Sequence, residues 1–281
     1  MEIEVIELSD SSGRFILSDV STSFANGIRR SMISEVPTMA IDEVNIYENT
    51  SVLFDEQIAT RLGLIPLKTD LDTYVEPENC QCDGGCAVCQ VSLMLSVESP
   101  EEVPKNQKTA TRIVHSGDFV PSDPNVVPAF DKIPIIKLIT AIPRKDRTSI
   151  SRQKIVLEAI ARLGKGSDHA KWQAAVACGY KNLPKIVIKN CNGCGKCVEV
   201  CPRDILVLNG ELSVINDAEC SQCKLCEETC DIDAIKIDKD DNAFVYDFET
   251  DGSLSAKELV LRAADTIKEK AEMMIKFFDE E

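Results

Sequence analysis

Eight of the thirteen cysteines in this 281-residue chain form one spacing that occurs twice. The spacing Cys-x2-Cys-x2-Cys-x3-Cys occupies Cys191, Cys194, Cys197 and Cys201, and it returns 29 residues later at Cys220, Cys223, Cys226 and Cys230. Three closely spaced thiolates on a tight loop can reach three corners of one cubane, and the fourth reaches another cluster. Two zinc sites or four disulfides are the alternatives. The doubled spacing favours two [4Fe-4S] clusters in a short duplicated segment.

Residues 185–240 resemble the bacterial-type two-cluster ferredoxins through this cysteine spacing. The resemblance implies a ferredoxin-like domain whose ligands cross between the copies. The first cluster would take Cys191, Cys194, Cys197 and Cys230. The second cluster would take Cys220, Cys223, Cys226 and Cys201.

The two copies differ beside their cysteines. Gly193 and Gly195 let the first loop approach inorganic sulfide closely and point amide donors at it. Gln222 and Lys224 replace these glycines in the second copy, and Asp231 stands where the first copy has a proline. We therefore expect the second cluster to receive fewer hydrogen bonds and to be more labile.

A separate cysteine group precedes this segment. It consists of Cys80, Cys82, Cys86 and Cys89, with Gly84 and Gly85 in the bend. Four thiolates on one loop suit tetrahedral structural zinc. A disulfide or reduced loop, or another metal, are the alternatives. Cys178 lies apart from all three clusters and is interpreted as a buried core thiol.

The charge and the hydropathy limit the possible partners. The formal net charge is −16 at pH 7, and a surface this acidic repels phosphates, so direct tight nucleic-acid binding is not expected. No apolar run approaches the roughly 20 residues that span a bilayer, and the first residues do not form a signal peptide. We expect a cytoplasmic protein with no membrane contact. The chain has two histidines, so its metal chemistry must rest on thiolates.

Apolar periodicity predicts an α+β fold. Alternation predicts a hairpin over residues 1–20 and strands over 40–47, 64–67, 91–97 and 133–142. Helical spacing predicts helices over residues 21–36, 55–62 and 151–163. A C-terminal helix begins at a capping box formed by Ser255 and Glu258. Its narrow apolar stripe includes Val260, Ile267, Met274 and Phe278, and it suits either another helix or the chain's own core.

Three stretches resemble the alpha-like assembly subunits of cellular RNA polymerases. Residues 26–40, with Arg29 and Arg30, match the dimerisation helix of that family, and residues 55–67, with Arg61, match the helix and strand that follow it. Residues 164–172 match the loop after the insert domain. The Cys80–Cys89 loop has the spacing of the zinc loop in the eukaryotic relatives. An iron-sulfur domain after this framework is a feature of the archaeal branch of the family.

The resemblance implies three domains. Residues 1–40, 150–185 and 241–281 would form an alpha-like dimerisation domain, residues 41–149 an insert domain with the cysteine loop, and residues 186–240 the iron-sulfur domain. The implied partners are the small archaeal subunit L, which would form a heterodimer with the chain, and the large catalytic subunits. Candidate interface residues are Arg29, Arg30, Arg61, Val260, Ile267, Met274 and Phe278.

The implied function is non-catalytic assembly of DNA-directed RNA polymerase. No carboxylate triad that would hold catalytic magnesium is present in the sequence, so the enzyme is the complex and no catalytic residue is assigned. The clusters would be structural or redox-regulatory. An electron-transfer subunit of an oxidoreductase explains residues 185–240 equally well but leaves the first 180 unexplained. A zinc-dependent nucleic-acid binder is weakened by the acidity.

Overall fold

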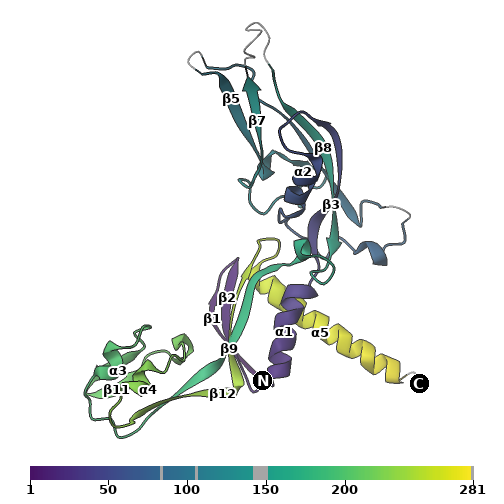
Figure 1. Ribbon diagram of the computed structural model, residues 1–281. Coiled ribbons are helices and arrows are strands. Elements are labelled where there is room, and N and C mark those ends of the chain that lie inside the picture. The colour runs from purple at the N-terminus through teal and green to yellow at the C-terminus, as the bar shows by residue number, and fades with distance from the viewer. Residues whose placement is uncertain (83–84, 105–106, 142–150, 280–281) are drawn as a thin grey trace. The chain divides into compact units, whose positions relative to one another are not determined.

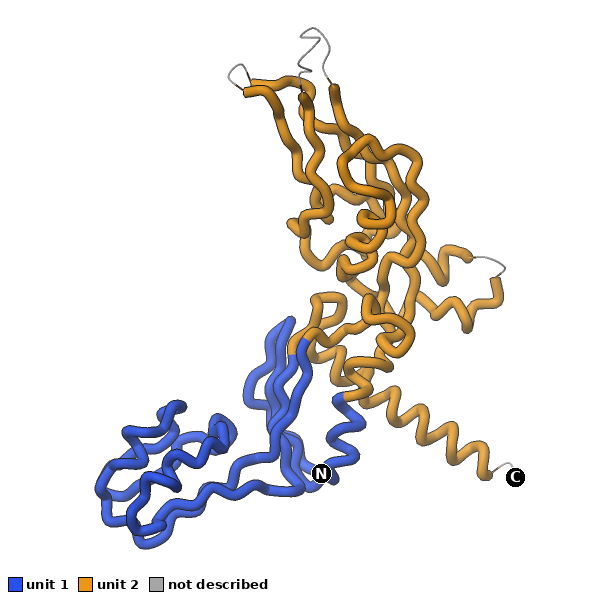
Figure 2. The backbone as a smooth tube through the Cα atoms, in the orientation of Figure 1, with its two compact units in different colours: residues 1–29, 177–248 blue, residues 30–176, 249–281 orange. Residues whose placement is uncertain are grey.

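The structure is a computed structural model that describes residues 1–82, 85–104, 107–141 and 151–279. It divides into two compact units (Figure 2). Unit 1 consists of residues 1–29 and 177–248, and unit 2 consists of residues 30–176 and 249–281. Each unit therefore combines segments that are far apart in the sequence.

The sheet of unit 1 has the strand order β1-β2-β12-β9. Its strands are β1 (Glu2–Leu8), β2 (Ser12–Ser18), β9 (Ala175–Ile188) and β12 (Ile235–Thr250). β1 and β2 form the predicted antiparallel hairpin. β1 lies at the edge of the sheet, where one side of its backbone has no neighbouring strand in the described chain.

Aromatic side chains fill the core of unit 1. The ring of Phe15 stacks on the ring of Tyr246 with centroids 4.7 Å apart, and Tyr180 lies 5.4 Å from the same tyrosine ring. The hydroxyl of Tyr246 donates to the carbonyl of Ala25 on helix α1 (Thr22–Ser34). A buried tyrosine needs such a partner for its hydroxyl, so this bond fixes the start of the helix on the sheet.

The duplicated cysteine segment lies between β9 and β12, which both extend into it (Figure 1). It contains α3 (Lys196–Glu199), β10 (Leu206–Asn209), β11 (Glu211–Val214), η4 (Asp217–Glu219) and α4 (Leu225–Glu228). Its small core includes Leu206, Ile235 and Ile237 beside the buried cysteines. A core this small suits a domain in which metal–ligand bonds supply part of the stability.

Unit 2 contains a sheet in the order β3-β8-β4-β6 and a second pair, β5-β7. The strands are β3 (Thr38–Asn49), β4 (Gln90–Glu98), β5 (Thr109–His115), β6 (Val120–Pro121), β7 (Pro134–Ala141) and β8 (Lys154–Gly164). The helical elements are α2 (Asp55–Gly63), η1 (Pro77–Asn79), η2 (Ser116–Asp118) and η3 (Ala170–Trp172). Buried residues of α2 and the strands form one core, which includes Ile58, Leu62 and Leu95.

Two expectations for unit 2 are wrong. Residues 154–164 form the strand β8 and not a helix, because Ile155, Leu157 and Ala159 alternate with less buried residues along a strand that has neighbours on both sides. Residues 64–67 do not form a strand; Leu67 makes one isolated bridge to Pro128. Pro66 has no amide hydrogen to donate to a strand ladder there.

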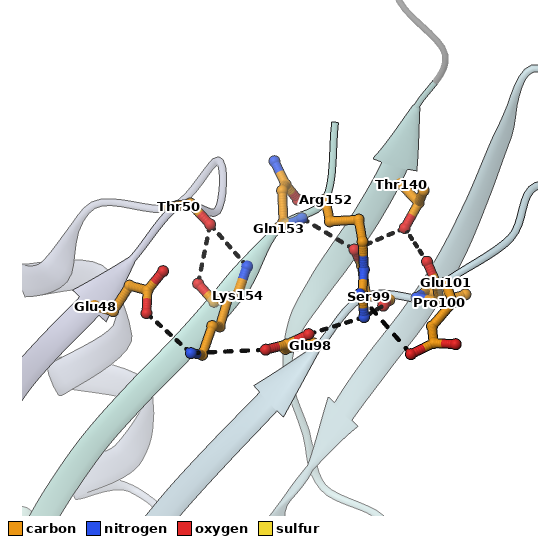
Figure 3. Close-up of polar contacts among 10 residues, drawn as sticks. All are labelled: Glu48, Thr50, Glu98, Ser99, Pro100, Glu101, Thr140, Arg152, Gln153 and Lys154. Atoms are coloured by element: carbon orange, nitrogen blue, oxygen red, sulfur yellow. Dashed lines mark hydrogen bonds and ion pairs between the residues drawn. The ribbon is translucent and has the colours of Figure 1, made fainter. Parts of the chain in front are cut away.

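A polar network joins the ends of several strands in unit 2 (Figure 3). The buried Ser99 hydroxyl accepts hydrogen bonds from the Thr140 hydroxyl at 2.7 Å and from the Gln153 amide at 2.9 Å. The ammonium of Lys154 pairs with Glu48 at 3.2 Å and with Glu98 at 3.6 Å. These bonds connect β3, β4, β7 and β8 at or next to the ends of the strands.

The C-terminal helix α5 (Ala256–Asp279) begins as predicted, with the Ser255 hydroxyl accepting from the amide of Glu258 at 3.2 Å. Its first turns are buried at Ala256, Leu259 and Ala263. From residue 268 to residue 279 every residue is exposed. No helix in the described part of the chain is both long enough and apolar enough to cross a membrane.

Candidate metal centres and interfaces

The Cys80–Cys89 loop gathers four sulfur atoms around one point. The Sγ atoms of Cys80, Cys82, Cys86 and Cys89 all lie within 4.8 Å of one another. Individual Sγ–Sγ separations are 3.4 Å (Cys80–Cys82), 3.7 Å (Cys80–Cys86), 3.5 Å (Cys82–Cys89) and 3.9 Å (Cys86–Cys89). Tetrahedral zinc with bonds of about 2.3 Å requires sulfurs about 3.8 Å apart, whereas a disulfide requires about 2.05 Å. The geometry therefore fits a tetrahedral ion.

Local backbone geometry positions these thiols. Gly85 has a φ of +111°, a backbone conformation that residues with a Cβ rarely adopt, so the bend favours glycine. The amide of Val88 donates to Cys86 and is the main cause that lowers the pKa of the Cys86 thiol to about 7. A lowered thiol pKa favours the thiolate, which is the form that binds metal. Gly84, the other predicted bend residue, lies outside the described residues.

The first crossed set of cysteines lies around a small cavity in unit 1. The cavity is lined by Cys191, Cys194, Cys197 and Cys230, together with Leu212 and Ile235. Cys191 and Cys194 are exposed, Cys197 is buried, and Cys230 lies between these extremes. Among the described residues, these four sulfurs are not gathered within 4.8 Å of one another as those of the Cys80–Cys89 loop are, which fits a cluster of several atoms better than one ion.

The second crossed set lies around another small cavity in unit 1. Its lining includes Cys201, Cys220, Cys223 and Cys226, with Ile186 of β9 and Ile237 of β12. Burial raises the pKa of the Cys226 thiol to about 11. An unliganded thiol there is neutral at pH 7, so binding a metal would release its proton.

The backbone of the two cysteine loops repeats at the same interval as the sequence. Gly193 and Gln222 both have positive φ, as do Gly195 and Lys224. The amide of Gly193 donates to Cys191 Sγ at 3.4 Å, and the amide of Gln222 donates to Cys220 Sγ at the same distance. These two bonds do not show the weaker donation that we expected for the second loop.

The candidate arginines lie in different environments. Arg29 donates to Asn26 on the same helix at 3.1 Å, and Arg30 is exposed. Arg61 donates to the carbonyl of Ile135 at 2.7 Å, so it joins α2 to β7 in addition to any contact with a partner. Cys178 is only partly buried, and burial raises the pKa of its thiol to about 11.

The candidate positions on α5 differ in exposure. Val260 and Ile267 are partly buried, whereas Met274 is 64% exposed and Phe278 is 69% exposed. Sequence reasoning missed three further apolar residues in this half of the helix, which are Met273, Ile275 and Phe277, all at least 60% exposed. It predicted β1 as part of a hairpin but missed that all seven residues of this strand are exposed. Alternating apolar residues, as in β1, indicate a strand with one buried face. The sequence does not say whether this chain or a partner chain buries that face.

Comparison with known proteins relates this chain to polymerase subunits. Residues 14–271 match the family described as the RNA polymerase Rpb3/Rpb11 dimerisation domain. A DNA-directed RNA polymerase subunit Rpo3 from Methanosarcina acetivorans is 49% identical, over 100% of this chain and 99% of that relative. Subunits of the same name are 41% identical in Methanosphaera stadtmanae, over 100% of both chains, and 41% identical in Archaeoglobus fulgidus, over 99% of this chain and 98% of that relative.

Proposed function

Because the chain belongs to the Rpo3 family of archaeal DNA-directed RNA polymerase subunits, we propose that it pairs with a small Rpb11-like subunit in the cytoplasm and thereby starts assembly of the enzyme. It is a non-catalytic subunit of the polymerase, and its contribution is structural. The family match extends over residues 14–271, so the electron-transfer alternative is not favoured. The observation that carries the proposed pairing is the exposed apolar half of α5.

The distal half of α5 is a surface that suits a partner helix. Residues 268–279 are exposed on every side, and they include two phenylalanines, two methionines and one isoleucine. Large exposed apolar side chains in a contiguous segment usually mark a protein interface. Their helical spacing suits a second helix that carries a similar stripe. We place the small partner subunit, the counterpart of archaeal subunit L, on this half of the helix.

β1 is a second candidate contact, in unit 1. Ile3, Val5 and Leu8 are each at least 48% exposed on a strand at the edge of its sheet. An uncovered apolar edge strand promotes aggregation, so such strands are usually protected by a partner or by charge. The neighbouring residues Glu2 and Glu4 supply some charge, and a partner chain would supply the rest.

Arg30 is the best candidate among the arginines for contact with a large catalytic subunit. It is exposed, and its guanidinium can bind a carboxylate with two hydrogen bonds. Arg29 and Arg61 already form hydrogen bonds within the chain. We therefore assign them two roles, which are to stabilise the local structure and to contact the partner.

The metal ligands belong to the same proposal. Two [4Fe-4S] clusters would occupy the two cavities of unit 1, with Cys191, Cys194, Cys197 and Cys230 around one and Cys220, Cys223, Cys226 and Cys201 around the other. Zinc would occupy the Cys80–Cys89 loop. The clusters would supply covalent cross-links to a domain with a small core, so iron supply or oxygen would tune assembly.

The pairing is tested with two double variants of the full chain, each co-expressed with the small subunit. Met274→Lys with Phe278→Lys places two positive charges on the apolar stripe and is expected to weaken co-purification at least about tenfold, because burying an unpaired charge at an interface is costly. Glu272→Gln with Asp279→Asn changes the net charge equally but spares the stripe, and it should pair normally. Equal pairing by both double variants would exclude α5 as the contact.

The role of the clusters needs a second assay. Serine at both Cys194 and Cys197 removes two ligands of the first set, and the heterodimer and the recruitment of the large subunits are then measured separately. Reduced recruitment supports an assembly role. Unchanged polymerase yield from a chain that has lost this iron contradicts an assembly role for the first cluster.

A further inference from the structure

The two cysteine loops of unit 1 share a backbone but differ in what their side chains contact. α3 and α4 occupy equivalent positions 29 residues apart, and the residues before them share positive φ angles. Two equivalent loops would be expected to have equivalent surroundings. The side chains of the second loop instead bond to the β1-β2-β12-β9 sheet.

Three side-chain contacts join the second loop to this sheet. The side-chain amide of Gln222 donates to the carbonyl of Asn182 on β9 at 3.3 Å. The ammonium of Lys181, also on β9, donates to the carbonyl of Cys220 at 2.7 Å. Arg14 on β2 forms an ion pair with Glu219, the residue that precedes Cys220.

These contacts lie where charges and hydrogen bonds are partly shielded from water. The side chains of Arg14 and Glu219 are 26% and 33% exposed. Lys181 is partly buried on β9. Partial burial strengthens such bonds relative to fully exposed ones, so the contacts restrict the second loop more than surface pairs would.

The first loop has no equivalent contacts. Asn190 and Gly193 occupy the positions that correspond to Glu219 and Gln222. Across the described residues 190–201, no side chain forms a hydrogen bond or an ion pair with β2 or β9; Lys196, for example, pairs with Asp231 inside the domain. The contacts with the sheet are therefore specific to the second copy.

In the second copy, Gln222 occupies a position whose backbone conformation is unfavourable for a residue with a side chain. Gln222 has a φ of +56°, a conformation that residues with side chains adopt far less readily than glycine. The first copy has glycine at this position. The side-chain bond to Asn182 gives the glutamine a role that glycine cannot perform.

We propose that Arg14, Lys181 and Gln222 are positioning residues that couple the second cysteine set to the β1-β2-β12-β9 sheet, so that this sheet responds to loading of the second site and not of the first. The coupling rests on the proposed clusters. It assigns the regulatory part of the proposed function to one site, Cys220, Cys223, Cys226 and Cys201. The first site then serves the stability of its own domain.

The test compares two matched serine variants of the full chain, loaded anaerobically with iron and sulfide. Cys194 and Cys223 are equivalent exposed ligands of the first and second sets. Hydrogen–deuterium exchange is measured over residues 12–18 and 175–188. Cys223→Ser is expected to speed exchange there about five- to tenfold, because the loop contacts that protect these strands loosen, whereas Cys194→Ser leaves it unchanged.

A second comparison leaves every cysteine in place, in case a serine variant unfolds the domain. Gln222→Glu has the same length but cannot donate to the Asn182 carbonyl, so it should speed exchange in residues 175–188 while iron content and the visible absorbance of the clusters stay constant. Lys224→Gly, which also changes a residue with positive φ in this loop, should have no such effect. A purely space-filling role for Gln222 predicts no change in the glutamate variant.

Iron counts distinguish the two possible failures. A parent chain that takes up no iron would overturn the proposed clusters and the coupling with them. A loaded parent whose Cys194→Ser and Cys223→Ser variants exchange equally in residues 12–18 and 175–188 would overturn the coupling alone.

Discussion

The hydroxyl of Ser31 on α1 donates to the backbone carbonyl of Ala263 on α5 at 2.9 Å, and both residues are buried. This bond lies at the end of the covered part of α5, just before the residues that are fully exposed. Helix α5 therefore has two parts. Its first turns pack within the chain, and its last turns are exposed.

Replacing Ser31 with alanine is expected to lower the free energy of unfolding by about 1 kcal/mol, the usual net value of one buried hydrogen bond. Chemical denaturation of the isolated chain measures the change. Ser23→Ala on the same helix is the control, since Ser23 is exposed and bonds only to the neighbouring Ser21 hydroxyl at 2.9 Å. Equal losses in both variants would contradict a specific contribution from the Ser31–Ala263 bond.

Replacing Cys86 with serine should remove zinc from the chain and leave the iron content unchanged. The reason is that Cys86 supplies one of four sulfurs around a single point in unit 2, whereas both cavities lie in unit 1. Elemental analysis after purification measures both metals. Cys178→Ser, which changes a cysteine outside the three clusters, should retain zinc. One zinc per chain in the Cys86→Ser variant would show that the loop does not hold the ion.

Replacing Gly164 with alanine should destabilise the chain by about 1–3 kcal/mol, the usual range for overpacking. A Cβ at this position would lie 2.5 Å from the indole ring of Trp172. The ring cannot move freely, because its N–H donates to the carbonyl of Arg162 at 3.2 Å. Gly179→Ala is the control, since nothing lies within 4 Å of its added Cβ. The denaturant midpoints of the two variants are compared. An unchanged midpoint for Gly164→Ala would show that the Trp172 ring moves to accommodate the added methyl group.

Replacing Asp251 with asparagine should raise the thermal midpoint at pH 7. Burial raises the pKa of the Asp251 carboxyl above its usual 3.8, so the folded chain binds the proton more tightly than the unfolded chain. Stability therefore falls as the pH rises from 3.8 through the raised pKa. Asparagine carries no charge and can still accept from the amide of Ser253, which lies 2.9 Å from Asp251 Oδ1. The advantage should vanish below pH 3.8, and a lower midpoint at pH 7 would refute this explanation.

The features that sequence predicted well are those encoded locally. The resemblance to two-cluster ferredoxins implied the crossed sets, and the same residues line two cavities, while their role as cluster ligands stays a prediction. The hairpin, α1, α2 and the start of α5 also follow from patterns within a few residues. Whether the cavities hold [4Fe-4S] clusters, and where the three implied domains begin and end, stay predictions.

The features that sequence did not reveal depend on distant neighbours. β8 has apolar residues at 155, 157, 159 and 160. This spacing mixes a period of two with a period of three, so it is compatible with a strand and with a helix. Pairing with neighbouring strands makes the segment a strand. The bond from Gln222 to Asn182 spans 40 residues and follows no periodic pattern. The apolar alternation in β1 is equally compatible with a covered strand and with one that awaits another chain.

β9 and β12 leave and rejoin their sheet as neighbours, and the amide of Lys189 donates to the carbonyl of Ala234 at 2.8 Å where the cysteine segment begins and ends. Excising residues 190–233 and closing the gap with a tight turn would thus preserve the strand order. Evolution could add or discard such a module without altering the strand order of the sheet, although Arg14 and Lys181 would lose their contacts with it. Dependence on iron would then be a trait that a lineage can acquire or lose in one genetic step.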